Sequence, residues 1–120
     1  MFVLDASALL AFLQEEPGWQ RVEQTLGQGI VGAANWSEVT QKLLARGADI
    51  SLATNLLFSY GLKVESVSES DAVAAAKLWH PGTNLSLGDR LCLALGKRLG
   101  VTVLTADKAW GEGAGIEQIR

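Results

Sequence analysis

The stretch that decides the fold lies at the N-terminus and reads Phe2-Val3-Leu4-Asp5-Ala6-Ser7-Ala8-Leu9-Leu10. Its first three residues form a short apolar run, which predicts a buried β-strand that ends at Asp5. Ser7 then opens a short helix, predicted over residues 8–14. Asp5 stands in an otherwise apolar run, so we expect its carboxylate to be at least half-buried.

The same alternation of strands and helices continues along the chain. Further strands are predicted over residues 30–33, 62–67, 101–104 and 116–119, and helices over residues 17–26, 35–46, 49–60, 68–79 and 86–99. Alternating strands and helices imply crossover connections and therefore a mostly parallel sheet. We expect a single three-layer α/β domain over residues 1–120, with a central, mostly parallel sheet flanked by helices.

The composition excludes several classes of protein. The 120 residues are 48% apolar and 19% charged, which excludes an intrinsically disordered chain. The chain has one cysteine, Cys92, so neither an internal disulfide nor a cysteine-rich zinc site is expected. No uncharged run approaches the ~20 apolar residues of a membrane helix, and the N-terminus lacks the basic start of a secretory signal. We therefore expect a cytoplasmic protein that does not associate with membranes.

Four acidic residues, far apart in the sequence, are predicted to meet at one edge of the sheet. Asp5 ends the first strand and Asp107 follows the fourth, while Glu38 and Asp89 lie in the first turns of two helices. Ligands of open α/β sheets bind beyond the carboxyl ends of the strands. Clustered carboxylates raise one another's pKa, and a bound cation removes that repulsion. A set of oxygen ligands without histidine or cysteine favours Mg²⁺ or Mn²⁺ over Zn²⁺, and these ions suit phosphoryl chemistry.

Most of these acids also have an ordinary structural interpretation. Glu38 could belong to the N-cap of a helix that starts at Asn35. Asp89 could complete a capping box with Ser86, and Asp107 could cap the turn that follows a strand. The carboxylate that ends the first strand is the hardest of the four to explain in this way.

The net charge is compatible with a nucleic-acid substrate. Thirteen acidic and ten basic residues give −3, and affinity for phosphate comes mainly from lysine and arginine. Setting aside the four carboxylates of a metal site leaves nine acidic against ten basic residues. The acidity of the chain therefore does not exclude RNA.

Four motifs, in order and spacing, resemble the PIN-domain ribonucleases, and within them the VapC toxins of bacterial and archaeal toxin–antitoxin pairs. They are residues 2–10, Asn35-Trp36-Ser37-Glu38-Val39, Leu85-Ser86-Leu87-Gly88-Asp89-Arg90-Leu91-Cys92-Leu93-Ala94-Leu95 and Val103-Leu104-Thr105-Ala106-Asp107-Lys108-Ala109-Trp110. The resemblance covers essentially the whole chain. It implies a PIN-like fold and a Mg²⁺- or Mn²⁺-dependent endoribonuclease, in which metal-activated water hydrolyses RNA phosphodiester bonds. It also implies a homodimer and a cognate antitoxin that blocks the site.

The resemblance also implies roles for individual residues. The four carboxylates become catalytic residues and metal ligands, and they are those of Asp5, Glu38, Asp89 and Asp107. Two hydroxyl groups would help to hold the site, namely those of Ser7 and Thr105, although a helix N-cap is equally open for Ser7. Transfer RNA, ribosomal RNA and messenger RNA are all open as substrates, as are one or two metal ions.

Basic and aromatic residues beside these motifs are candidates for contact with RNA. Arg90 and Lys108 each adjoin a proposed ligand, and Lys97 lies two turns after Arg90 on the same helix face. The alternative for each of them is a solvated surface charge. Trp36 and Trp110 could stack on a base; we expect Trp110 to be the more open and Trp36 to pack in the core.

Two other functions stay open from the sequence. A HAD-type phosphatase requires a second aspartate two residues after the first, but Ser7 stands at that position. A non-catalytic RNA-binding module of PIN-like fold needs no site of four acids, and its binding of RNA would not depend on Mg²⁺.

Overall fold

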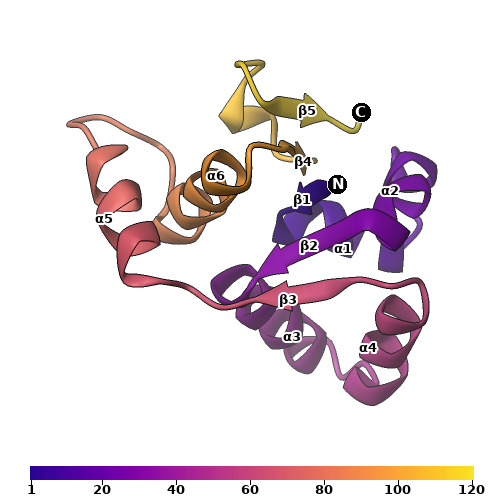
Figure 1. Ribbon diagram of the computed structural model, residues 1–120. Coiled ribbons are helices and arrows are strands. Elements are labelled where there is room, and N and C mark those ends of the chain that lie inside the picture. The colour runs from indigo at the N-terminus through magenta and orange to yellow at the C-terminus, as the bar shows by residue number, and fades with distance from the viewer.

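A parallel sheet of five short strands forms the centre of the molecule (Figure 1), shown here in a computed structural model that describes residues 1–120. The strands are β1 (Phe2–Leu4), β2 (Gly29–Gly32), β3 (Lys63–Glu65), β4 (Thr102–Thr105) and β5 (Ile116–Gln118). They lie in the order β3-β2-β1-β4-β5, and every neighbouring pair is parallel. The predicted parallel sheet is confirmed, with the N-terminal strand at its centre.

Six helices and two short 3₁₀ turns connect the strands. They are α1 (Ala6–Leu13), α2 (Trp19–Thr25), α3 (Ala33–Ala45), α4 (Ile50–Ser59), α5 (Glu69–Lys77) and α6 (Leu87–Leu99), with 3₁₀ turns at Leu26–Gln28 and Lys108–Trp110. No helix is long and apolar enough to cross a membrane.

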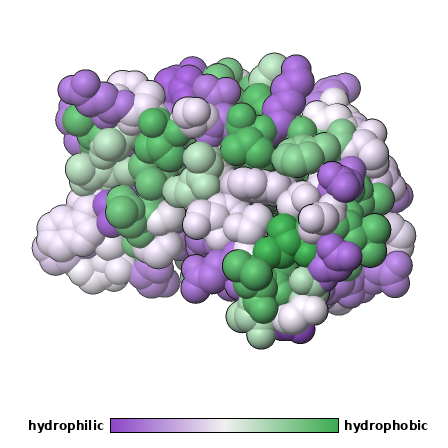
Figure 2. Space-filling model, turned by 90° about the horizontal axis from the view of Figure 1, so that it is seen from below, coloured by the Kyte–Doolittle hydropathy of each residue, from purple (hydrophilic) through white to green (hydrophobic).

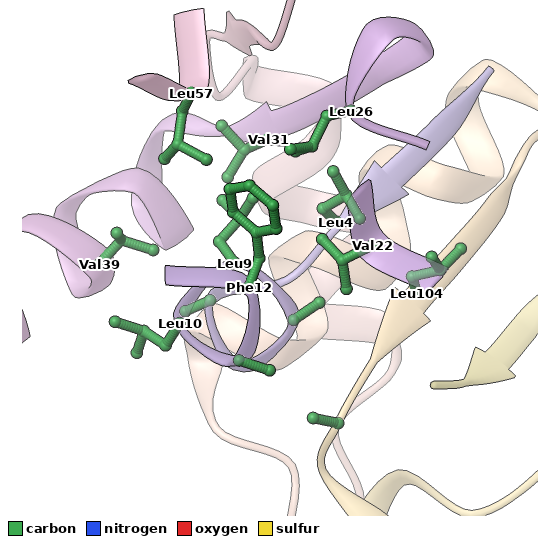
Figure 3. Close-up of a cluster of buried hydrophobic side chains, with 14 of the residues drawn as sticks. Leu4, Leu9, Leu10, Phe12, Val22, Leu26, Val31, Val39, Leu57 and Leu104 are labelled. Atoms are coloured by element: carbon green, nitrogen blue, oxygen red, sulfur yellow. The ribbon is translucent and has the colours of Figure 1, made fainter. Parts of the chain in front are cut away.

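Alternate side chains of the strands pack on opposite faces of the sheet, as the two-residue period of a strand requires. Leu4, Val31 and Leu104 pack with residues of α1, α2, α3 and α4 in the larger apolar cluster, part of which Figure 3 shows. Val3 and Val103 pack on the opposite face, against α6. The molecule therefore has three layers, and the predicted α/β class is confirmed.

Helix α5 is attached to the rest of the molecule chiefly through α6. Arg98, near the end of α6, donates to both carboxylate oxygens of Asp71, near the start of α5, at 2.7 and 3.1 Å. Arg90, near the start of α6, donates to the carbonyl oxygen of Ala75 at 3.0 Å. The two contacts fix the helices antiparallel, so that the loop over residues 78–86 returns the chain to the start of α6 (Figure 1).

Several predicted helix starts are confirmed by their caps. Ser68 and Asp71 form a complete capping box at the start of α5, and Ser86 and Asp89 form another at the start of α6. Asp49 caps α4 by accepting the N–H of Leu52 at 3.0 Å. Each cap pairs backbone donors that the first helical turn would otherwise leave unsatisfied.

Two other helices begin elsewhere than predicted. α2 begins at Trp19 rather than at Pro17, because the left-handed Gly18 is its N-cap. α3 begins at Ala33 rather than at Asn35, because the chain turns into the helix directly from the extended Gly32 at the end of β2. Asn35 therefore lies inside the first turn, with its side chain free for another role.

Apolar side chains remain exposed on α4. Leu52 is 71% exposed and Phe58 is 46% exposed. Phe58 packs on Trp36 of α3, with the ring centroids 5.3 Å apart. Figure 2 views the molecule from below, the side on which α3 and α4 lie in Figure 1, and shows apolar side chains gathered on that face.

Candidate functional site

Asp5 is buried at the carboxyl end of β1, where three groups donate to its carboxylate. The N–H of Ala8 donates at 2.8 Å, the Ser7 hydroxyl lies 2.7 and 2.9 Å from the two oxygens, and the Thr105 hydroxyl donates at 2.5 Å. Asp5 rather than Ser7 is therefore the N-cap of α1. Ser7 and Thr105 were expected to help hold the site, and the structure places both hydroxyl groups on the carboxylate of Asp5.

The environment of Asp5 opposes its negative charge. Burial raises the pKa of Asp5 from an ordinary value of 3.8 to about 6, and the negative charge of Asp89 adds to the rise. Hydrogen bonds from Thr105, Ala8 and Ser7 lower the pKa but do not offset the burial. A buried carboxylate without a positive partner is the kind of group that a bound cation stabilises.

The same hydroxyl groups tie β1 to the loop that follows β4. The Ser7 oxygen accepts the N–H of Ala106 at 2.9 Å, and the Thr105 oxygen accepts the N–H of Asp107 at 3.0 Å. Asp107 is thus connected to Asp5 through a single side chain. The carboxylate of Asp107 caps the 3₁₀ turn that follows, as predicted by the structural alternative for this residue.

A buried thiol, that of Cys92, is affected by the charges of three of the candidate carboxylates. Cys92 is buried on α6, and burial raises the pKa of its thiol well above the usual value. The negative charges of Asp5, Asp89 and Glu38 raise this pKa further. They belong to three different elements, since Asp5 follows β1, Glu38 lies on α3 and Asp89 on α6.

Both helical carboxylates also make local hydrogen bonds. Glu38 Oε1 accepts from Asn35 Nδ2 at 2.8 Å, and Asp89 Oδ2 accepts the N–H of Ser86 at 3.0 Å. No three side chains of histidine, cysteine, aspartate or glutamate are close enough together to hold a metal ion directly.

The chemistry of the donors nevertheless fits Mg²⁺ or Mn²⁺. Every candidate ligand is an oxygen atom, and the buried Asp5 carries a charge that no lysine or arginine offsets. Mg²⁺ keeps several of its waters and is usually bound through one or two protein carboxylates. Asp5 and Asp89, whose charges act on each other, could supply such a pair.

The basic candidates lie in three different settings. Arg90 turns toward α5, where it donates to Ala75, and its Nε is buried without a hydrogen-bond partner. Lys97 is exposed and lines the groove between α5 and α6 together with Arg98. Lys108 is exposed directly after Asp107. Of the three, Lys108 lies most openly beside a candidate ligand.

One of the two tryptophans differs from its expected exposure. Trp110 is buried and packs in the smaller apolar cluster beneath α6, so the expectation that it is the more open one is wrong. The tail that follows it forms β5, whose Ile116 packs against the same cluster, and the local sequence does not reveal this. Trp36 is partly buried against the larger cluster, close to the core position expected.

Asn35 has a role that the sequence does not reveal. Its side chain donates to Glu38 and also to the carbonyl oxygen of Gly88 on α6 at 3.2 Å, 53 residues along the chain. The Asn35–Glu38 spacing predicts a helix cap, and only the three-dimensional structure brings Gly88 to this pair.

A parallel α/β sheet with acidic side chains beyond the carboxyl ends of its strands defines the class of this protein. The family model of the PIN domain matches residues 2–115, and the chain therefore belongs to the PIN domain family. A solved structure described as a toxin–antitoxin complex from Klebsiella pneumoniae contains a similar fold, with a TM-score of 0.81 and 15% identity over 100% of this chain and 98% of that chain. A search of curated proteins finds no match.

Proposed function

We propose that this chain is a Mg²⁺- or Mn²⁺-dependent endoribonuclease that acts as a toxin in the cytoplasm of a bacterium or archaeon. Membership of the PIN domain family and the similar fold in a toxin–antitoxin complex support this proposal. The observation that carries it is the buried carboxylate of Asp5 at the carboxyl end of β1, which Ser7 and Thr105 hold by hydrogen bonds and which no lysine or arginine neutralises. In this proposal residues 1–120 form one functional domain.

The residues of the site divide the work among them. Asp5 and Asp89 hold the cation, Ser7 and Thr105 orient the carboxylate of Asp5, and Asp107 and Glu38 contribute through water. Glu38 is also placed to orient the attacking water. The cation, when bound, supplies positive charge that polarises the phosphate and activates the water for hydrolysis.

Lys108 is the strongest candidate for binding a phosphate of the RNA, because it is exposed beside Asp107. Arg90 is engaged with Ala75, and Lys97 lies in the groove between α5 and α6. We therefore assign Arg90 and Lys97 a weaker contribution to RNA binding than Lys108. Lys97 contributes least, because it lies further along α6 from Asp89 than Arg90 does.

The proposed partners are a second copy of the chain and a cognate antitoxin that blocks the site. The description of the similar solved structure supports the antitoxin. Exposed apolar side chains on α4, including Leu52 and Phe58, supply a surface on which one of the two partners can bury apolar area.

The first test is RNA cleavage by the purified protein with Mg²⁺ or Mn²⁺, against EDTA and against Asp5→Asn. Asp49→Asn is a matched control, because Asp49 also caps a helix through its carboxylate but lies on α4, away from the site. We expect cleavage by the wild type and by Asp49→Asn, and none with EDTA or with Asp5→Asn. Cleavage that survives in EDTA or in Asp5→Asn contradicts the proposal.

Two further readouts separate the alternatives. A metal-induced rise in melting temperature without cleavage of any RNA class identifies a non-catalytic module. Hydrolysis of a small phosphate monoester, rather than of RNA, identifies a phosphatase of the HAD type.

A further inference from the structure

Asn35 is a buried polar residue whose hydrogen bonds all lead to the candidate site. It is 2% exposed, and its Nδ2 donates to Glu38 Oε1 at 2.8 Å and to the carbonyl oxygen of Gly88 at 3.2 Å. Its own Oδ1 is buried and has no hydrogen-bond partner. An unpaired buried carbonyl destabilises a fold, so stability alone does not account for an asparagine at this position.

The orientation of the amide is set by what it faces. Turned over, Asn35 would point its Oδ1 at the carboxylate of Glu38 and at the carbonyl of Gly88, which are both acceptors. The observed orientation joins these two acceptors through one NH₂ group and leaves the Oδ1 unpaired instead. Asn35 therefore links α3 to the first turn of α6.

Gly88 makes room for the same carboxylate. A Cβ atom at Gly88 would lie 2.6 Å from Glu38 Oε1, closer than real Cβ atoms come, and 3.2 Å from Glu38 Cδ, which is a tight contact. Gly88 immediately precedes Asp89 in α6. The missing side chain is what allows the carboxylate of Glu38 to lie against α6, beside Asp89.

We propose that Asn35 and Gly88 act together to position Glu38 beside Asp89, so that the two carboxylates serve the same cation. Asn35 supplies the directed hydrogen bond and Gly88 supplies the space. This inference rests on the proposed function, since it assigns the two residues a role in binding the metal ion of that site. Asn35 is a positioning residue, because it acts through Glu38.

The two variants that test this are Gly88→Ala and Asn35→Ala. Alanine is the better helix former, and the backbone of Gly88 has no positive φ, so Gly88→Ala is expected to melt at or above the wild-type temperature. The new methyl group nevertheless displaces the carboxylate of Glu38, because this flexible end of the side chain must move away from it. The matched controls are Gly113→Ala, where a Cβ meets only an ordinary contact at 3.6 Å, and Asn55→Ala on the exposed side of α4.

The first readout is the affinity for Mn²⁺, measured by titration calorimetry on the full chain. Residues that orient a metal ligand typically change metal affinity by 10- to 100-fold, so we expect about a tenfold weaker Kd in Gly88→Ala and Asn35→Ala. Both controls should bind as the wild type does. In a Glu38→Gln background the same two substitutions should have little further effect, because they act through the carboxylate that is already lost.

The second readout needs no metal. In EDTA, the side-chain amide signal of Asn35 in a ¹H–¹⁵N spectrum should shift in Gly88→Ala and in Glu38→Gln, and should stay in place in Gly113→Ala. This separates a contact between Asn35 and Glu38 from a general effect on packing.

The outcomes distinguish the inference from the proposed function. Wild-type Mn²⁺ binding with unchanged affinity in Gly88→Ala, or equal losses for Asn35→Ala with and without Glu38, overturns the positioning role while the metal site stands. A wild-type protein that binds neither Mn²⁺ nor Mg²⁺ overturns the metal site itself, and the positioning role with it.

Discussion

Asp5 performs two structural tasks in addition to its proposed chemistry. It caps α1 through the N–H of Ala8, and it ties the centre of the sheet to the end of β4 through Thr105. Neither task requires a charge, since an amide oxygen could accept the N–H of Ala8 equally well. The two structural tasks therefore do not explain why the buried side chain is charged, whereas binding of a cation would.

Asp5→Asn is expected to separate these tasks. The amide keeps its bond to Ala8, and its NH₂ group can donate to the hydroxyl oxygens of Ser7 and Thr105. We expect metal-dependent cleavage to disappear, while the melting temperature in EDTA at neutral pH rises because the buried charge is gone. Calorimetry and RNA cleavage on the same preparation check both. A variant that melts below the wild type would show that the charge contributes favourably to the fold.

The raised pKa of Asp5 also predicts a pH dependence of stability in EDTA. Between about pH 4 and pH 6 the unfolded chain has released this proton while the folded chain still holds it. The unfolded state then binds fewer protons, so the free energy of unfolding falls as the pH rises through this window, by about 3 kcal/mol for this group.

Urea unfolding of the wild type and of Asp5→Asn over the same pH range isolates this contribution. The difference between the two proteins should grow from pH 4 to pH 6 and level off above it. A difference that is constant with pH would mean that the carboxyl group ionises in the folded protein as it does in the unfolded one.

At the scale of the elements, the sequence predicted best where local rules decide. The capping boxes at Ser68 and Ser86 placed α5 and α6 correctly, because a cap depends on residues only three apart. Asn35 was misplaced as a cap because its partners are decided by packing, one of them on α6. The burial of Trp110 depends on the position of β5, which has no local sign near the tryptophan.

The candidate site divides in the same way. The four carboxylates could be selected from the sequence because strand ends and first helical turns of a parallel sheet face one edge. What the sequence did not reveal is how each carboxylate is held. The link from Asp5 to Thr105 joins residues 100 positions apart, and the space at Gly88 has meaning only once α3 lies beside α6.

Gly96 tests the packing of α6 on the sheet. A Cβ atom there would overlap a methyl group of Val103 on β4, whose backbone neighbours are fixed in the sheet. We expect Gly96→Ala to lower the free energy of unfolding by about 1–3 kcal/mol, because overpacking outweighs the gain in helix propensity. Urea unfolding measures the effect. An unchanged midpoint would mean that α6 can move away from β4 without loss.

At the scale of the whole molecule, the exposed apolar side chains of α4 predict association. Leu52 is 71% exposed, so Leu52→Glu should leave the melting temperature nearly unchanged. We expect the same substitution to weaken self-association by at least tenfold if α4 is part of the proposed homodimer. Sedimentation equilibrium of the wild type and of Leu52→Glu measures this change in self-association. Glu69→Gln, at an exposed position of α5, is a suitable control. Unchanged association would place the interface elsewhere.

Strand β1 lies at the middle of the sheet, between β2 and β4, and its Phe2 pairs with Thr102. On the ribosome, Asp5 has no hydroxyl from Thr105 until the chain between these two residues has been synthesised. In the proposed function, the site of a growing chain is therefore incomplete until β4 has been synthesised, and the proposed antitoxin is needed only from then on. A chain that ends at Gly100 should bind no Mn²⁺ and cleave no RNA. Cleavage by this fragment would show that the site is active without β4 and Thr105.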